Sequence, residues 1–298
     1  FLKPLQFGFF YSNEMQKFIN DNASNYDLIF FYHIRASQYL PNNFYGKTII
    51  EIGDLYSSNY MQTFDNLNIL NPLKYVYLLE SFLVKRIENE ILRKFDKIIL
   101  FSKQEIKKID KQFLNKVIHM NISIENIKKK YRYSKNNKKI LFIGNLKYLP
   151  NILAVKNFIK LNLQKLKKKI PDIRLEIIGE VSNFDKFLLS KNKNVKFWGA
   201  QKNLDKFING SICGLANLKI ATGVQGKILS YMSYGLPVVC SKKVAHNFDK
   251  HVLSYSEENE MINKIFKLKN NKKLSSQISK KSLRFINSFS WKKIEKNY

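Results

Sequence analysis

The sequence predicts an α/β protein built on two sheets of parallel strands, and three observations support this. Short apolar runs of strand length alternate with longer amphipathic runs, which is typical of parallel strands connected by helices. Residues 128–138 are polar and charged without an apolar period, which indicates a linker near the middle of the chain. With 298 residues, 45% of them hydrophobic, the chain is long enough for two domains with cores of their own.

The apolar pattern predicts each element by its residue range. The expected strands are Leu28–His33, Thr48–Ile52, Lys97–Ser102, Lys116–Met120, Lys139–Ile143, Arg174–Ile178, Val195–Trp198, Ile212–Ala216, Val238–Ser241 and Val252–Tyr255. The expected helices are Lys74–Lys94, Gln104–Gln112, Ile152–Lys168, Asn183–Leu189, Leu204–Asn209, Val224–Tyr234, Glu257–Lys267 and Lys273–Ser288. We therefore expect one domain over residues 1–130 and a second over residues 131–298.

The composition narrows the classes of function. The net charge is +29, but only six of the 52 basic residues are arginine, the side chain that nucleic-acid readers favour. We interpret the charge as a basic, solvated surface with weak attraction to anionic membranes, and we expect no specific nucleic-acid partner. Cys213 and Cys240 lack metal-ligand or redox spacing, which favours buried thiols in a reducing cytosol. No apolar run reaches the length of a membrane-spanning helix, and no signal peptide follows Phe1.

The first motif is KKILFIGNLKYLPN, residues 138–151. A buried strand ends at Gly144, a polar loop follows, and Pro150 suits the first turn of the next helix. Backbone N–H groups and the helix dipole together favour an anion at such a junction, and Asn145 and Lys147 can add donors. The alternative is a tight turn of the kind found in any α/β protein.

The second motif is ATGVQGKILSYMSYGLPVVCS, residues 221–241. Its glycines allow close approach of backbone to a ligand, and Gly235 suits the left-handed end of the helix that begins near Val224. Lys227 lies in the first turn of that helix, where it opposes the dipole unless an anion neutralises both. This placement favours a diphosphate ligand; the alternative is a surface lysine that extends past the helix end.

These residues resemble a known family, the GT-B glycosyltransferases of family 4 and their exopolysaccharide sugar-transferase relatives. The resemblance runs through FIGNLKYLPNILAVKNFI, LEIIGE, NVKFWG, ATGVQGKILSYMSYGLPVV and the closing FSWKKIEKNY, in matching order and spacing. It extends more weakly into the first half through YDLIFFYHIRASQYL, IEIGDLYSSNY and ESFLVKRIENEILRKFDKIILFSKQE.

The resemblance implies two Rossmann-like domains that face each other across a cleft. The second domain is expected to hold a nucleotide-sugar donor and the first an acceptor, without a metal or other cofactor. The terminal helix of the second domain, which contains Trp291, is expected to return to the first domain. Nothing in Phe1–Asn20 resembles the strand, glycine-rich loop and helix with which the family begins, so we expect the chain to start inside the first domain.

The resemblance also assigns site residues. The donor-binding residues are expected to be Gly144, Asn145, Lys147, Thr222, Gly223, Val224, Lys227 and Ser230. Two family carboxylates, the second of which holds the ribose hydroxyls, map onto Thr222 and Ser230. Both are hydroxyls in this chain, so they offer neutral rather than charge-assisted hydrogen bonds.

His33 and Arg35 follow the strand Leu28–His33 and are the candidate catalytic residues. The carboxyl ends of parallel strands face the ligand crevice in open α/β folds. His33 can serve there as acid, base or hydrogen-bond donor, and Arg35 can hold an acceptor phosphate. The alternative is a loop histidine and a structural arginine paired with a carboxylate such as Asp54.

The resemblance therefore implies a retaining, metal-independent hexosyltransferase that moves a sugar from a nucleotide-diphosphate sugar to a glycan or lipid-linked acceptor. We expect it to act in surface polysaccharide synthesis, in the cytoplasm or at the inner face of the membrane. Two alternatives remain open. One is a non-catalytic relative that binds a glycan or nucleotide, and the other is a basic polyanion-binding protein.

Overall fold

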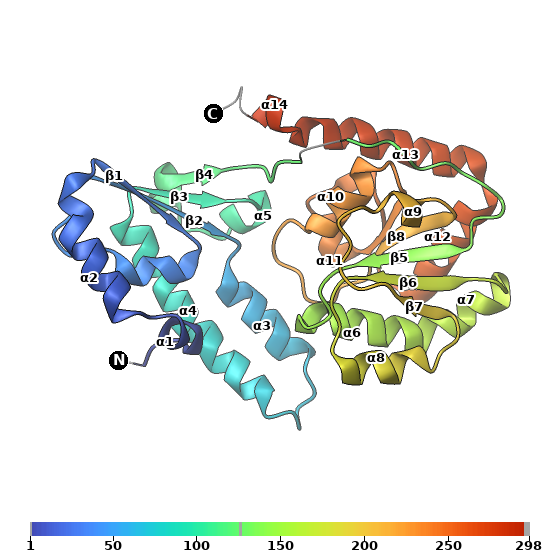
Figure 1. Cartoon of the computed structure of the whole chain (residues 1–298), viewed down its shortest axis with the longest axis horizontal. Helices are drawn as coiled ribbons and strands as arrows, with labels where there is room; N and C mark the ends of the chain where they lie inside the picture. The colour runs from blue at the N-terminus through green and yellow to red at the C-terminus, as the bar shows by residue number, and fades with distance from the viewer. Residues whose placement is uncertain (1, 125–126, 295–298) are drawn as a thin grey trace. The chain divides into compact units, whose positions relative to one another are not determined.

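The computed structural model describes residues 2–124 and 127–294 and divides the chain into two compact units (Figure 1). The first unit comprises Phe1–Asn121 together with Thr222–Val224. The second comprises Ile122–Ala221 and Gln225–Tyr298. Both are α/β units with parallel sheets, which confirms the predicted fold class.

The first unit is built on a parallel sheet with the strand order β1-β2-β3-β4. Its strands are β1 (Leu28–Tyr32), β2 (Lys47–Gly53), β3 (Lys97–Leu100) and β4 (Val117–His119). Its helices are α1 (Leu5–Phe9), α2 (Asn13–Asn22), α3 (Tyr56–Asn66), α4 (Leu73–Lys94) and α5 (Lys103–Ile106), with 3-10 turns η1 (Ala23–Asn25), η2 (Ile34–Tyr39) and η3 (Lys111–Lys116). Apolar side chains of β2, β3 and α4, including Ile50, Ile98 and Ile91, form its core.

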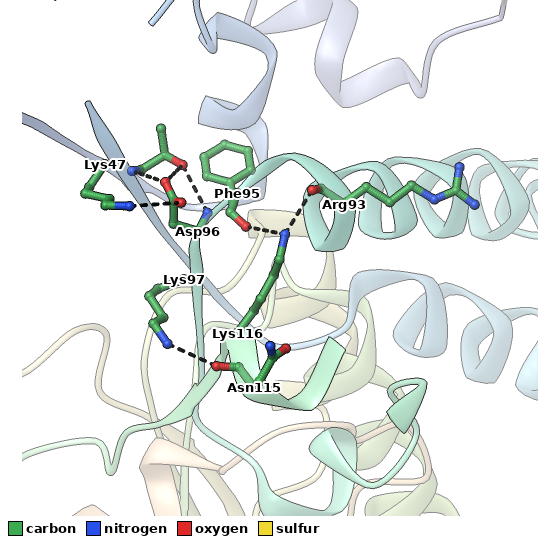
Figure 2. A network of polar contacts seen from close by, with 8 residues as sticks. Lys47, Arg93, Phe95, Asp96, Lys97, Asn115 and Lys116 are labelled. Carbon is green, nitrogen blue, oxygen red and sulfur yellow. Dashed lines mark hydrogen bonds and ion pairs between the residues drawn. The ribbon is translucent and has the colours of Figure 1, made fainter. Parts of the chain in front are cut away.

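A polar network closes the amino ends of β2 and β3 (Figure 2). The backbone N–H and hydroxyl of Thr48 donate to Asp96 Oδ2 at 2.8 and 3.0 Å, and these bonds lower the pKa of Asp96. The Lys116 ammonium donates to Arg93 O and Phe95 O at 2.9 and 3.0 Å, which satisfies carbonyls at the end of α4. The network therefore joins α4, β2 and β3 at the edge opposite the strand ends that precede His33.

The second unit is built on a parallel sheet with the strand order β10-β9-β8-β5-β6-β7. Its strands are β5 (Lys139–Ile143), β6 (Arg174–Ile178), β7 (Val195–Phe197), β8 (Ser211–Ala216), β9 (Val238–Ser241) and β10 (Leu253–Tyr255). Because β5 pairs with β6 on one side and β8 on the other, the strand order reverses between β5 and β8. Such a reversal is where open α/β sheets bind ligands, at the carboxyl ends of the strands.

The helices of the second unit connect these strands and cover both faces of the sheet (Figure 1). They are α6 (Leu149–Asn157), α7 (Gln164–Lys169), α8 (Asn183–Ser190), α9 (Asp205–Ile208), α10 (Gly226–Ser233), α11 (Lys242–Ala245), α12 (Glu258–Asn270), α13 (Lys272–Ile286) and α14 (Trp291–Ile294), with 3-10 turns η5 (Asp249–His251) and η6 (Asn287–Phe289). A π-helical segment, η4 (Phe158–Leu163), connects α6 to α7. Within the described residues, no helix has the length and apolar character needed to cross a membrane.

Two expectations about local structure differ from what is observed. The helix expected over Gln104–Gln112 is shorter in the structure, where α5 ends at Ile106. A separate 3-10 turn, η3, follows because the Asp110 side chain caps it by accepting from Gln112 N. The expected linker at residues 128–138 lacks helix and strand, but it is fixed to the second unit. Its Lys128 N and Tyr131 N donate to Ser233 O and Tyr234 O at 2.8 and 2.9 Å.

Candidate functional site

In the second unit, two loops follow the strands at which the sheet order reverses. The loop after β5 begins at Gly144 and leads to α6, and the loop after β8 leads to α10. Both helices therefore start at the carboxyl edge of the sheet. Their N-terminal N–H groups carry partial positive charge, so this edge favours an anion.

Two glycines allow the first loop to fold close to its neighbours. A Cβ on Gly144 would lie 2.9 Å from Asn151 Nδ2, and a Cβ on Gly179, which follows β6, would overlap Gly144 O. Leu146 N donates to Glu180 O at 2.7 Å, which fixes the loop beside the end of β6. Gly179 is thus required for the shape of the loop. The sequence analysis missed this role, although the glycine stands at a predicted strand end.

Asn151 connects the two loops. Its Nδ2 donates to Asn145 O at 2.8 Å, and its Oδ1 accepts from the Lys227 ammonium at 2.5 Å. The side chain is buried at the start of α6. The structure therefore brings together Gly144, Asn145 and Lys227, three of the predicted donor-binding residues, through a residue that the motif analysis did not single out.

Lys227 lies in the first turn of α10 without a carboxylate partner among the described residues. Its ammonium sits 4.5 Å from the centroid of the Phe142 ring, and burial lowers its pKa from 10.5 to about 7. A cation at the positive end of a helix is unfavourable, and removal from water adds to that cost. A bound anion would offset both the repulsion from the helix dipole and the cost of removing the ammonium from water.

Helix α10 is anchored to the sheet through Tyr231, which is fully buried. Ile143 N donates to Tyr231 Oη at 2.7 Å, and the Tyr231 hydroxyl lies 3.1 Å from Leu141 O, to which it donates. The ring lies directly against Gly214 of β8, where any Cβ would overlap it. The position of α10, and so of Lys227, is set by contacts with β5 and β8.

The remaining predicted donor residues have other environments. The Lys147 ammonium pairs with Glu180 at 3.0 Å, and both side chains are exposed. The Ser230 hydroxyl donates to Gly226 O at 3.0 Å within α10. Thr222, Gly223 and Val224 group with the first unit, where Asn59 Nδ2 donates to Thr222 Oγ1 at 3.4 Å. Their shared role in donor binding stays a prediction.

In the first unit, His33 and Arg35 follow β1 as expected. His33 has a φ of 73°, which is unusual for a residue with a side chain. Its Nδ1 accepts from Arg35 N at 3.3 Å and from Arg35 Nε at 3.2 Å, and its Nε2 lies 2.6 Å from Tyr56 Oη. The Arg35 guanidinium lies 4.1 Å from the centroid of the Phe10 ring. Arg35 therefore contacts a histidine and an aromatic ring, rather than Asp54 as the structural alternative held.

These contacts define the state of His33. Because Nδ1 accepts two N–H groups, Nε2 carries the proton and donates to Tyr56 Oη. Burial, and secondly the charge of Arg35, lower the pKa of His33. A neutral imidazole with its acceptor nitrogen occupied is suited to donate a hydrogen bond and poorly suited to act as a base. Tyr56, which sequence reasoning missed, holds this ring.

Buried carboxyl groups surround the turn between β2 and α3. Leu55 N donates to Glu105 Oε1 at 3.1 Å, and Ser57 N donates to Glu88 Oε1 at 3.0 Å. Burial raises the pKa of Asp54 to about 6, and burial together with the charge of Asp54 raises that of Glu105 to about 8. In the described parts of the chain, no group of three or more His, Cys, Asp or Glu side chains is arranged to hold a metal ion.

Comparison with known proteins identifies the second unit and the overall fold. Residues 137–271 match the family model for Glycosyl transferases group 1. No curated protein sequence matches the chain.

Solved structures match over both units. They include TarM from S. aureus in complex with Fondaparinux, alpha-GlcNAc-glycerol and UDP, with 14% identity, a TM-score of 0.66, and coverage of 95% of this chain and 57% of TarM. HepE from Anabaena in complex with UDP and glucose has 14% identity and a TM-score of 0.67 over 95% of this chain and 79% of HepE. A trehalose-6-phosphate synthase has 12% identity and a TM-score of 0.67 over 100% of this chain and 78% of the synthase.

The chain thus spans little more than half the length of TarM. At these identities the structural matches show the fold, and the family match identifies the segment that contains Gly144, Asn151 and Lys227. Segment 137–271 thus matches the family model for group 1 glycosyltransferases, and the chain has the GT-B fold of these solved structures.

Proposed function

We propose that this protein transfers a sugar from a nucleotide-diphosphate sugar to a glycan or lipid-linked acceptor. The observation that carries the proposal is Lys227, a partly buried cation at a helix N-terminus beside the glycine loop of β5. The diphosphate of a nucleotide sugar supplies the negative charge that this position lacks. The solved TarM and HepE structures contain UDP, so UDP-sugars are the first donors to test.

The proposed chemistry is stabilisation of the leaving diphosphate. When the bond to the sugar breaks, negative charge develops on the diphosphate, and donors already held in place stabilise it without reorganisation. Lys227 supplies the charge, while Asn151 holds its ammonium beside the loop of Gly144. His33 donates to the transferred sugar when its N–H exchanges the bond to Tyr56 Oη for one to the sugar, while Arg35 continues to hold the ring through Nδ1. This scheme uses no metal ion.

We further propose a retaining reaction in surface polysaccharide synthesis, at the cytoplasmic face of the membrane. Retention is supported by the similarity to a trehalose-6-phosphate synthase structure that addresses glycosyl transfer with retention. The membrane location is supported by the net charge of +29, which favours anionic lipid surfaces.

The test is calorimetric titration of UDP and UDP-sugars, followed by product analysis with candidate acceptors. We expect saturable binding to the wild type that Lys227→Met weakens strongly. If the protein binds nucleotide but transfers sugar to none of the acceptors, the non-catalytic alternative is favoured. That alternative is supported by Thr222 and Ser230, which carry hydroxyls where the family has carboxylates. Absence of any nucleotide binding by a folded protein would refute the proposal.

A further inference from the structure

The hairpin formed by α3 and α4 in the first unit exposes an apolar surface. Its turn and the first half of α4 carry the large side chains Ile69, Leu70, Leu73, Tyr75, Val76, Leu79 and Phe82, all of them exposed. The exposed fraction reaches 87% at Leu70, 68% at Ile69 and 62% at Phe82. Tyr75, Leu79 and Phe82 recur at helical spacing and so form one stripe along α4. We call these seven residues the hairpin surface.

This surface lies in a segment almost free of exposed charge. Between Asn66 and Val84 the only ionisable groups of Lys, Arg, Asp and Glu are Lys74 and Glu80. The Lys74 ammonium donates to Phe64 O and Leu67 O at 2.6 and 3.1 Å, so its charge offsets the negative end of α3. Glu80 is buried and accepts from Leu5 N at 2.9 Å. Two such residues in 19 is well below the 25% of charged residues in the whole chain.

The exposed apolar side chains of α2 and α8 have charged neighbours. Phe18 of α2 lies beside Lys17, with Glu14 and Asp21 in the same helix. Phe184 and Phe187 of α8 are interleaved with Asp185 and Lys186. The hairpin surface therefore differs from the exposed apolar residues of α2 and α8 in its lack of charge.

Basic residues follow directly after the apolar stripe. Lys85 and Arg86 come one turn beyond Phe82, and Arg93 and Lys94 lie near the end of α4. Lys85 and Arg86 pair with Glu88 and Glu90, but about half of each basic side chain stays exposed. From Leu73 to Phe82 the helix rises about 14 Å. An apolar tip of this length with a basic rim matches insertion into the boundary between lipid headgroups and acyl chains.

We propose that the hairpin surface docks on an anionic lipid bilayer, with Ile69 and Leu70 entering first and Lys85 and Arg86 at the level of the headgroups. The partner is a lipid surface rather than a protein because the basic rim and the net charge of +29 complement anionic lipid. The proposal goes beyond sugar transfer, since it assigns a surface outside the candidate donor site.

The test is co-sedimentation of the full chain with vesicles of phosphatidylcholine, with and without phosphatidylglycerol. We expect binding to the vesicles that contain phosphatidylglycerol and little binding to phosphatidylcholine alone. Leu70→Asp should weaken the binding at least about tenfold, because it removes the most exposed apolar side chain and adds repulsion. The matched control is Phe184→Asp, an equally drastic change at a 70% exposed site in the second unit, which should change binding less than about twofold.

A second measurement locates the inserted residue. Cys213 and Cys240 are buried, so Leu70→Cys provides a selective site for an environment-sensitive dye. Its emission should shift to shorter wavelength with anionic vesicles, whereas the same dye at Phe184→Cys should not shift.

Three outcomes would overturn the proposal. Leu70→Asp could bind as tightly as the wild type, or Phe184→Asp could lose as much binding. Alternatively, sedimentation without lipid could show an oligomer that Leu70→Asp dissociates, which would make the hairpin surface a protein interface. Turnover with a water-soluble acceptor should be unchanged in Leu70→Asp, so this test is separate from that of sugar transfer.

Discussion

Replacement of Lys227 by methionine should stabilise the free protein while it weakens donor binding. Methionine keeps the length and apolar stem of the side chain and removes the charge. In the folded protein, burial lowers the pKa of Lys227 from 10.5 to about 7, so the charged form is disfavoured. The substitution therefore separates the cost of holding a cation in this place from the benefit that the cation provides to a ligand.

The expected gain in stability follows from the two pKa values. A lysine with this change in pKa costs at most about 4 kcal/mol at pH 7. Partial exposure of the side chain reduces that figure to about 2 kcal/mol. Loss of the hydrogen bond to Asn151 Oδ1 costs about 1 kcal/mol, which leaves a net gain of about 1 kcal/mol.

The sign of the pH dependence can also be derived. Because the folded pKa lies below the unfolded one, the folded protein binds fewer protons between pH 7 and 10.5, and wild-type stability rises across that window. The advantage of Lys227→Met should therefore be greatest at or below pH 7 and should vanish as the pH approaches 10.5. Nucleotide-sugar affinity should fall about ten- to hundredfold, as expected for loss of a charge-assisted contact.

Urea unfolding at several pH values and calorimetry with UDP-sugars would measure both effects. Lys160→Met, at an exposed lysine of the same unit, is the control and should change neither quantity appreciably. If Lys227→Met destabilised the protein at pH 7, the lysine would be a structural residue. If the variant bound donor as well as the wild type, the diphosphate would not contact Lys227.

Three further predictions concern other parts of the two units. Ser230→Glu should tighten nucleotide-sugar binding about tenfold in calorimetry, because a carboxylate forms stronger bonds to ribose hydroxyls; unchanged affinity in an active enzyme would remove this position from the ribose site. Gly179→Ala should lower the free energy of unfolding by about 2 kcal/mol or more, since its Cβ would overlap Gly144 O. Gly226→Ala is the control, because its Cβ meets no atom within 4 Å, and it should be neutral or stabilising. Similar free energies of unfolding for the two variants would argue against the loop packing. Glu105→Gln should remove a loss of wild-type stability that accompanies a rise in pH from about 4.5 to about 8, because its raised pKa means that the fold favours the protonated carboxyl; parallel pH profiles in urea unfolding would contradict this.

The strands were predictable because each is a short apolar run between polar residues, and β5, β6 and β9 have the predicted bounds. Helix α3 was missed because its buried positions include Ser57 and Thr63, which hide the apolar period. Its start is fixed instead by Glu88, a residue 31 positions away that accepts from Ser57 N. Such a contact between distant side chains leaves no local pattern.

The candidate site divides in the same way. Gly144 and Lys227 were predictable, because a glycine at a strand end and a lysine in a first helical turn are local features. Asn151 and Tyr56 were not, because their roles lie in contacts with residues of other elements, Lys227 and His33 respectively. The neutral state of His33 also depends on the geometry around its ring, which the order of residues does not specify.

The contact between Tyr231 and Gly214 has a consequence for how such a sheet can diverge or be redesigned. No side chain fits at position 214 while the ring is present, and no smaller residue at position 231 can place a hydroxyl between β5 and β8. The two positions therefore change together or not at all, and an intermediate with one change would either overlap or leave Ile143 N without its acceptor. Attempts to alter donor preference by shifting α10 have to begin with this pair, because it determines how deeply the helix that carries Lys227 sits on the sheet.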